Sequence, residues 1–425
     1  MIKRENYLNT LRSLRDEHLI KVITGVRRAG KSTLLAMYRD ELLQSSIPPE
    51  RIISLNFEEE QNEWLLDRHT LMGYIKERLS DSEMNYIFLD EIQKVPDFEI
   101  LVDALFVKPN VDLYITGSNA YMLSGELATY LSGRYVEINI LPFSFKEFLQ
   151  VFDDNLDLNQ RFNQYLHYSA FPQAAQMVEY KPDAVNNYLR GIYESVIVKD
   201  ILARKDIKNR YNLELVLKYM ADNIGNITSP NRIANILSNN NTTISTHANA
   251  TTSTHTKNTP LTNTPIKGTT IENYLTALTE SFVLYKTERW DTKGRKILQT
   301  LEKYYIVDLG LRRILLGRSD SSDLGHLLEN VIYLELKRRG GEIYIGKVGD
   351  NQEIDFVVKT AEGDLEYYQV AYTVAEPSTL QRELAAFQAI KDNYPKTLLT
   401  LDPLSFNENG IKHINAISWL LGKVS

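Results

Sequence analysis

One segment near the N-terminus constrains the fold more than any other part of the sequence. Residues 25–33 read GVRRAGKST, which has the G-x-x-x-x-G-K-[ST] spacing of a phosphate-binding loop. An apolar run, 20–23, precedes the loop and a helix-like segment, 34–43, follows it, which is the strand–loop–helix context that the motif requires. Its two glycines permit a tight turn with backbone N–H groups directed at phosphate oxygens, beside the positive end of a helix dipole. The segment therefore predicts nucleotide binding.

The residue types in the loop suit a nucleoside triphosphate with Mg²⁺. We expect Lys31 to reach the β- and γ-phosphates and the Ser32 hydroxyl to be a Mg²⁺ ligand. The predicted nucleotide-binding residues of the loop are Gly25, Arg28, Ala29, Gly30, Lys31, Ser32 and Thr33. Arg27 and Arg28 are unusual inside such a loop, and three contacts stay open for them: the triphosphate, a partner or water.

The next part of the chain alternates short apolar runs with helix-like segments. The expected strands are 51–57, 86–89, 111–116 and 135–140, and the expected helices are 64–79 and 100–106. This alternation is typical of an α/β fold with a parallel sheet covered on both faces. Ligands of such sheets bind at the carboxyl ends of the strands. We therefore expect a P-loop NTPase parallel sheet over residues 1–150.

Two acids end the run 86–89. Asp90 is predicted to hold Mg²⁺ through water, opposite Ser32, and Glu91 to orient and deprotonate an attacking water. The alternative is a strand that stops at two solvated acids. The presence of the phosphate loop favours the catalytic interpretation.

Three further polar residues are candidates. Ser118 and Asn119 follow the run 111–116, where a polar group could sense the γ-phosphate, although Gly117-Ser118-Asn119 is equally typical of a plain turn. Arg134 precedes the run 135–140. It is either an arginine finger for a neighbouring subunit's nucleotide, which requires a homo-oligomer, or a surface arginine.

Composition sets wider bounds. A chain of 425 residues should form two or three domains, and its net charge of −7 argues against a globally basic nucleic-acid coat. There is no cysteine, which excludes disulfides, thiolate metal sites and cysteine nucleophiles. The N-terminus lacks the pattern of a secretory signal, and no apolar run approaches the ~20 residues that span a bilayer. We expect a cytoplasmic protein with no membrane partner.

Several motifs together resemble one family. They are residues 25–33, 89–93, 116–119 and 132–134, followed by LPFSFKEF at 141–148. The chain resembles the bacterial and archaeal AAA-type ATPases whose C-terminal region is the domain called DUF4143. The resemblance implies ATP as the nucleotide, Mg²⁺ as its metal, and a catalytic glutamate adjacent to the magnesium aspartate, as Glu91 and Asp90 are here.

The middle of the chain divides into two expected segments. Residues 151–225 have helical spacing and are predicted to be a lid or connector. Residues 226–318 resemble a winged-helix domain, interrupted by a Thr- and Asn-rich insert, 238–268, that we expect to be disordered. Within 286–318, nine Lys or Arg stand against four acids, including Lys293, Arg295, Lys296, Arg312 and Arg313. This excess could bind double-stranded DNA, or it could be a solvated face of a protein–protein module.

Residues 319–425 are expected to be an α+β domain whose order of elements resembles the restriction-endonuclease-like fold. Glu329 and Asp355 match two metal-ligand positions of that fold. Gln369-Val370-Ala371 stands where an acid-x-Lys pair would fall, so one ligand and the lysine are missing, although Glu353 could substitute as a ligand. The sequence thus favours a docking platform for a protein partner over a nuclease.

We therefore predict a Mg²⁺-dependent ATPase that couples its nucleotide state to a conformational change on a DNA or protein partner. A slow-turnover nucleotide-gated switch is the alternative, and a nuclease using Glu329 and Asp355 is the least favoured.

Overall fold

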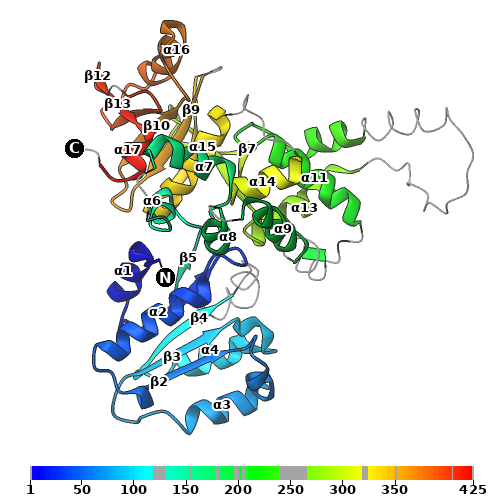
Figure 1. The fold of residues 1–425 in the computed structure, drawn as a ribbon, viewed down its shortest axis with the longest axis vertical. Coiled ribbons are helices and arrows are strands. Elements are labelled where there is room, and N and C mark those ends of the chain that lie inside the picture. Colours follow the sequence, from blue (N-terminus) through cyan, green and yellow to red (C-terminus); the bar gives the residue numbers. More distant parts are fainter. Residues whose placement is uncertain are drawn as a thin grey trace, which may run out of the picture. The chain divides into compact units, whose positions relative to one another are not determined.

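The first half of the chain is organised by a five-stranded parallel sheet with strand order β2-β3-β4-β1-β5 (Figure 1). In this computed structural model the chain forms two compact units, the first comprising 1–153, 170–180 and 280–282, and the second the rest. The structure describes residues 2–117, 131–153, 156–178, 181–195, 201–202, 207, 209–238, 266–317, 324–349, 352–403 and 405–423.

The elements of the first unit follow the predicted alternation. They are α1 (Glu5–Ser13), β1 (Ile20–Thr24), α2 (Lys31–Gln44), β2 (Ile52–Asn56), α3 (Arg68–Lys76), β3 (Asn85–Asp90), α4 (Phe98–Phe106), β4 (Val111–Thr116), β5 (Tyr135–Asn139), α6 (Phe145–Leu149) and α8 (Pro172–Met177), with short 3-10 turns at Pro49–Arg51, Glu60–Leu65 and Ile92–Lys94. The predicted α/β fold class with a P-loop sheet is confirmed.

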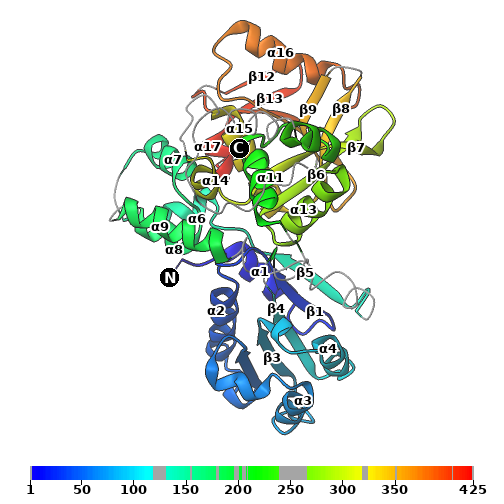
Figure 2. The same ribbon diagram turned by 90° about the vertical axis from the view of Figure 1, so that its right-hand side faces the viewer.

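Helices cover both faces of this sheet. Figure 2 shows α2 on one face and α3 and α4 on the other. Leu71 of α3 and Leu101 of α4 pack in one core cluster with alternate residues of the strands, such as Val22 and Leu89. On the opposite face Tyr38 of α2 contacts strand aromatics. Because β1, β3 and β4 are buried along their whole length, their sequences are mostly apolar, which made these strands predictable.

Two charged residues interrupt those runs at the amino ends of the strands. Lys21 of β1 donates to the Asp112 carboxylate of β4 at 2.6 Å, and the two side chains are 0% and 1% exposed. Lys21 also donates to the Glu17 carbonyl, and Asp112 accepts from Tyr114 and from the Asp16 amide. Every charge buried at this edge of the sheet is therefore paired and hydrogen-bonded.

The second unit contains an eight-stranded mixed sheet with strand order β12-β13-β11-β10-β9-β8-β6-β7. Its elements are α7 (Leu158–His167), α9 (Pro182–Tyr193), α11 (Arg210–Asp222), α13 (Gly268–Glu280), β6 (Leu284–Asp291), β7 (Lys296–Ile306), α14 (Leu309–Leu316), α15 (Leu324–Arg339), β8 (Glu342–Val348), β9 (Gln352–Lys359), β10 (Leu365–Val370), α16 (Pro377–Gln388), β11 (Lys396–Thr400), β12 (Phe406–Glu408), β13 (Ile411–Asn415) and α17 (Ala416–Leu420). This confirms an α+β region after the ATPase-type sheet. None of the described helices has the length and apolarity needed to cross a membrane.

The units differ from the expected segments. The hairpin β6–β7 lies within 226–318, the expected winged-helix domain, but pairs through β6 with β8 and so shares a sheet with the strands of 319–425. Residues 170–180, expected in the connector, fold with the first unit, where the Phe143 amide donates to the Ala170 carbonyl. The expected insert lies almost wholly outside the described residues. These differences arise from pairings between distant segments, which local patterns do not encode.

We expect Lys21→Met to lower the free energy of unfolding of the first unit by about 3–5 kcal/mol, because it leaves the Asp112 carboxylate buried without its cation. Urea unfolding measures the change. The control Arg39→Met removes a half-exposed pair with Asp40 and should cost less than ~1 kcal/mol. Equal effects of the two substitutions would contradict this interpretation.

Candidate active site

The polar residues singled out by the sequence meet at the carboxyl edge of the first sheet. The phosphate loop leaves β1, Asp90 ends β3, and β4, which ends at Thr116, lies between those two strands. Parallel strands bring their carboxyl ends to one edge, so residues far apart in the sequence become neighbours there.

The loop has the backbone conformation that its glycines allow. Gly25 has φ of +135°, and a Cβ added to it would lie 2.2 Å from the Ile140 carbonyl oxygen. Gly30, with φ of +100°, precedes α2, whose first turn has no side-chain cap. Both positions require glycine, the first because of φ and a close approach, the second because of φ. The loop therefore exposes backbone N–H groups at the start of a fourteen-residue helix.

Lys31 is a buried cation that the protein compensates only in part. Its side chain is 4% exposed, and its ammonium donates to the Gly25 carbonyl at 3.1 Å and lies 3.7 Å from Glu91 Oε1. Burial lowers the pKa of Lys31, an effect that the Glu91 and Asp90 carboxylates offset incompletely. An anion added beside this ammonium would stabilise a charge that its present neighbours compensate only partly.

Asp90 accepts a hydrogen bond from the neighbouring strand, since Thr116 Oγ1 donates to Asp90 Oδ1 at 2.5 Å. Burial raises the pKa of Asp90, and the Ser32 and Thr116 hydroxyls beside it lower that pKa. Ser32 therefore lies near the Asp90 carboxylate.

Glu91 has a strained backbone conformation that a hydrogen bond to Thr116 helps to hold. Its φ of +56° lies in the left-handed region, which costs a non-glycine residue about 1–3 kcal/mol. The Glu91 amide donates to Thr116 Oγ1 at 2.9 Å, and Gln93 Nε2 donates to Glu91 Oε2. Gln93 Oε1 is buried with no hydrogen-bond partner among the described atoms. Thr116 therefore holds the backbone of Glu91, and Gln93 orients its carboxylate. Gln93 Oε1 could accept a hydrogen bond from a water beside that carboxylate.

These residues fit a nucleotide with Mg²⁺. Ser32 and Asp90 could supply the hard oxygen ligands that Mg²⁺ prefers, and this ion usually takes only one or two protein ligands because substrate phosphates and water complete its shell. Across the described residues no group of three or more His, Asp or Glu is placed to hold a metal ion by itself.

The remaining polar residues of the predicted site that the structure describes are exposed or half-buried. Arg28 is exposed with φ of +72°, and Arg27 bonds Glu58 at 3.2 Å. Ser32 and Thr33 are exposed at the start of α2. Arg134 is exposed and pairs with Asp103 of the same chain. Ser118 and Asn119 lie outside the described residues.

Sequence reasoning missed three contributors. Thr116 and Gln93 lie in the motifs 116–119 and 89–93, but the sequence analysis assigned them no role. Thr116 could have been found from its position at the end of β4, and Gln93 from its position two residues after Glu91. The third, Pro172, lies 3.8 Å from a Cβ built on Gly30, and no local pattern indicates this contact.

The candidate nuclease residues surround a lysine. A cavity of about 560 Å³ in the second unit is lined by Glu329, Glu353, Asp355 and Lys303 among others. Lys303 Nζ of β7 lies 2.6 Å from Glu353, 3.3 Å from Glu329 and 3.7 Å from Asp355. Burial lowers the pKa of Lys303, but the three carboxylates more than offset this and raise it.

This lysine occupies the position that a metal ion would need. Burial and the neighbouring Glu329 raise the pKa of Asp355 to about 8, which further weakens it as a metal ligand. Gln369, at the expected acid-x-Lys position, accepts from the Asp355 amide through Oε1 and donates to Glu383 through Nε2. The residues therefore do not fit the metal site of a nuclease, because Lys303 stands among the carboxylates and Gln369 is engaged in structural hydrogen bonds.

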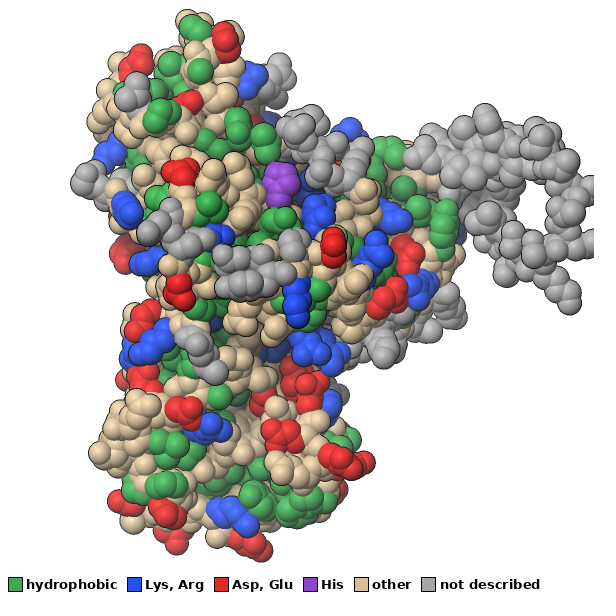
Figure 3. All heavy atoms as spheres, in the orientation of Figure 1, with side chains coloured by type: hydrophobic (Ala, Val, Ile, Leu, Met, Phe, Trp, Pro, Cys, Tyr) green, Lys and Arg blue, Asp and Glu red, His purple; other side chains and the backbone are tan. Residues whose placement is uncertain are grey.

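The basic residues of 286–318 do not form one surface. Lys293, Arg295 and Lys296 are exposed at the β6–β7 turn. Arg312 is buried and donates to the Ala221 carbonyl, while Arg313 donates to His167 and Asn186. On the face drawn in Figure 3, side chains of both signs are interspersed over the first unit. Fewer basic residues are therefore available at the surface of the second unit than the sequence suggests, because Arg312 and Arg313 bond groups of the protein itself.

Comparison with known proteins gives matches over the whole chain. Residues 17–149 match the family described as an AAA domain, and residues 159–322 match a domain of unknown function, DUF8612, rather than the DUF4143 region that the resemblance implied. An uncharacterized protein of Haemophilus influenzae is 39% identical over 99% of each chain. One of Methanocaldococcus jannaschii is 28% identical over 93% of this chain and 84% of its own. Among solved structures, a Walker-type ATPase of Pyrococcus abyssi is 15% identical over 74% of this chain and 96% of its own, with a TM-score of 0.47.

We expect Gly25→Ala to abolish nucleotide binding, because the added methyl group would overlap the Ile140 carbonyl and φ of +135° is strained for alanine. Binding of a fluorescent ATP analogue measures the loss. Gly73→Ala is the matched control: it lies within α3 with nothing near its Cβ, so it should bind normally and gain about 0.5–1 kcal/mol of stability. Normal binding by Gly25→Ala would refute the described loop conformation.

Lys303→Met should lower the free energy of unfolding of the second unit by about 3–5 kcal/mol, since three carboxyl groups would then crowd a buried site without a cation. Chemical denaturation measures it. Adding Glu353→Gln should recover part of the loss by removing one charge. If the single variant were as stable as the wild type, the ammonium would not be holding this cluster together.

Proposed function

Since the chain belongs to one family with its uncharacterized Haemophilus influenzae relative and carries an AAA-type domain at residues 17–149, we propose that it binds ATP with Mg²⁺ and hydrolyses it to ADP and phosphate. The observation that carries the proposal is the meeting of Lys31, Asp90 and Glu91 at one edge of the sheet, around Thr116. A buried cation, a metal-type carboxylate and a fixed general base are the parts that this chemistry requires.

Each residue has a distinct task in the proposed reaction. Lys31 and the loop amides bind the phosphates, and Ser32 and Asp90 hold the metal site. Bound Mg²⁺ would neutralise charge on the phosphate oxygens. Glu91 takes a proton from the attacking water, and Gln93 keeps its carboxylate in place for that transfer.

We propose that the second unit passes the nucleotide state to a partner, either DNA or protein. The exposed Lys293, Arg295 and Lys296 at the β6–β7 turn support phosphate contacts, which would weaken as salt rises. Arg134 is available to act as an arginine finger toward the nucleotide of a neighbouring copy of the chain. Its exposed ion pair with Asp103 costs less than ~1 kcal/mol to break.

Glu91→Gln should lower kcat for ATP hydrolysis by at least about 100-fold while nucleotide binding persists, because the amide cannot accept the proton. Lys31→Ala should instead abolish binding, and EDTA should stop wild-type turnover. Phosphate release under steady-state conditions measures each effect. Glu77→Gln, an exposed change at the end of α3, is the control and should retain full activity. Undiminished turnover by Glu91→Gln would eliminate Glu91 as the base.

The same assay tests the partner. Stimulation by duplex DNA that declines between low and high salt would support a DNA-coupled ATPase, whereas indifference to DNA would point to a protein partner. A turnover of about one per binding event would favour the slow switch.

A further inference from the structure

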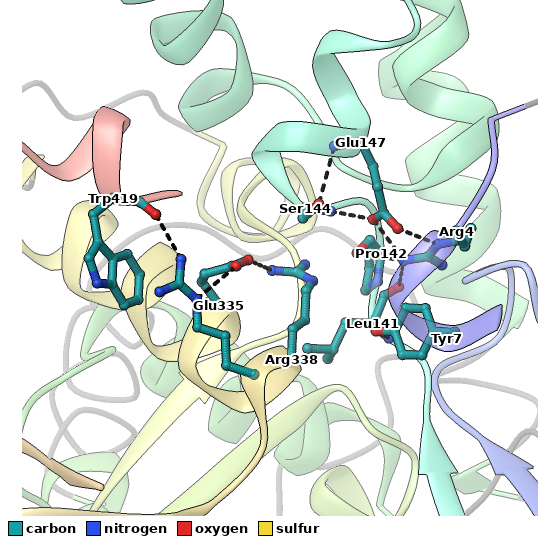
Figure 4. A network of polar contacts seen from close by, with 10 residues as sticks. Arg4, Tyr7, Leu141, Pro142, Ser144, Glu147, Glu335, Arg338 and Trp419 are labelled. Carbon is teal, nitrogen blue, oxygen red and sulfur yellow. Dashed lines mark hydrogen bonds and ion pairs between the residues drawn. The ribbon is translucent and has the colours of Figure 1, made fainter. Parts of the chain in front are cut away.

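Arg4 is a buried arginine that precedes both the first helix and the part of the chain that matches the AAA domain. It is 3% exposed, and its guanidinium carbon lies 4.8 Å from the ring centre of Tyr7 (Figure 4). The ring centre of Phe143 lies 5.4 Å from the same carbon. A charged group is rarely buried to this degree unless it is paired. Its partners therefore indicate what it does.

The guanidinium connects three parts of the first unit. Nη1 donates to the Ala29 carbonyl at 3.0 Å, and Nη2 donates to the Leu141 carbonyl at 2.9 Å. Nε and Nη2 each donate to one oxygen of the Glu147 carboxylate at 3.0 Å. Glu147 is itself fixed by a capping box with Ser144 at the start of α6, as Figure 4 shows.

The contact with Ala29 bears directly on the phosphate loop. Ala29 lies inside the loop, one residue before Gly30 and two before Lys31. Because a trans peptide unit is planar, its carbonyl and the following N–H point in opposite directions. Arg4 holds the Ala29 carbonyl, so it turns the Gly30 N–H away from itself and fixes the orientation of one of the loop's amide donors.

The same segment supports the other end of the loop. The Ile140 carbonyl lies against Gly25, and the Ile140 amide donates to the Thr24 carbonyl at 2.8 Å. Leu141 follows and accepts from Arg4. Residues 140–147 thus contact the beginning of the loop directly and its end through Arg4.

We propose that Arg4 is a positioning residue for nucleotide binding, which holds the phosphate loop in its binding conformation through the Ala29 carbonyl. This inference rests on the proposed ATP binding for its functional consequence. A loop that is released from Arg4 would spend less time in the competent conformation, and the apparent affinity falls by that fraction. Lysine cannot replace arginine here, since it lacks the planar fork that reaches Glu147 and two carbonyls at once.

The test compares full-length wild type with Arg4→Lys, Arg4→Met and the control Lys21→Met. Lys21→Met also removes the cation of a buried ion pair in the same unit, but at the opposite edge of the sheet. We expect Arg4→Lys to raise the Kd and KM for ATP about tenfold or more, with kcat changed less than about threefold. Lys21→Met should lower Tm at least as much and leave Kd and KM unchanged in the folded protein.

Hydrogen exchange without nucleotide provides a second readout that does not depend on ATP. Amides of residues 25–33 should exchange faster in Arg4→Lys than in wild type, and at the wild-type rate in Lys21→Met. This readout also serves if Arg4→Met does not fold.

The outcomes separate the two proposals. If the wild type binds no ATP, the proposed function fails, and faster loop exchange in Arg4→Lys would still support the positioning role. If the wild type binds ATP and Arg4→Lys has the wild-type Kd and loop exchange, the inference is overturned and Arg4 serves only stability.

Discussion

Burial of the first sheet on both faces is the constraint on which the rest of this unit depends. Strands β1, β3 and β4 have helices on either side, so their central residues must be apolar. Charged groups are then confined to the two ends of the strands. At the amino end, Lys21 and Asp112 form an ion pair, and Asp112 accepts further hydrogen bonds from the Asp16 amide and the Tyr114 hydroxyl. At the carboxyl end, the glycines of the phosphate loop keep side chains away from the backbone, and the buried charges are left partly unpaired.

The sequence predicted the parts of this arrangement that local patterns encode. The bounds of β4 agree with the expected 111–116, and Asp90 ends β3 with Glu91 directly after it. Two-sided burial produces continuous apolar runs, and glycine spacing marks the loop, so both signals are short-range.

What the sequence did not predict depends on contacts between distant residues. Arg4 and Glu147 are 143 positions apart, and Lys303 meets Glu353 across strands that are not adjacent in the sheet. Thr116 gains its role only because β4 lies between β1 and β3. Residues 226–318 were expected to form a winged-helix domain, but the pairing of β6 with β8 places the β6–β7 hairpin in the sheet of the C-terminal strands, and the composition of 286–318 does not specify that pairing.

Two buried lysines illustrate why similar residue types do not imply similar sites. Lys303 lies 2.6 Å from one carboxylate and within 3.7 Å of two more, and these neighbours raise its pKa. Lys31 Nζ lies 3.7 Å from the Glu91 carboxylate, and burial lowers the pKa of Lys31. The first lysine is satisfied by the protein itself, so a metal or an anion entering that cavity would have to break an existing cluster. The positive charge of Lys31 is only partly balanced by its protein neighbours, so a bound anion would stabilise it further. Of the two clusters of lysine and carboxylates, the one beside the phosphate loop is therefore built for an anionic ligand.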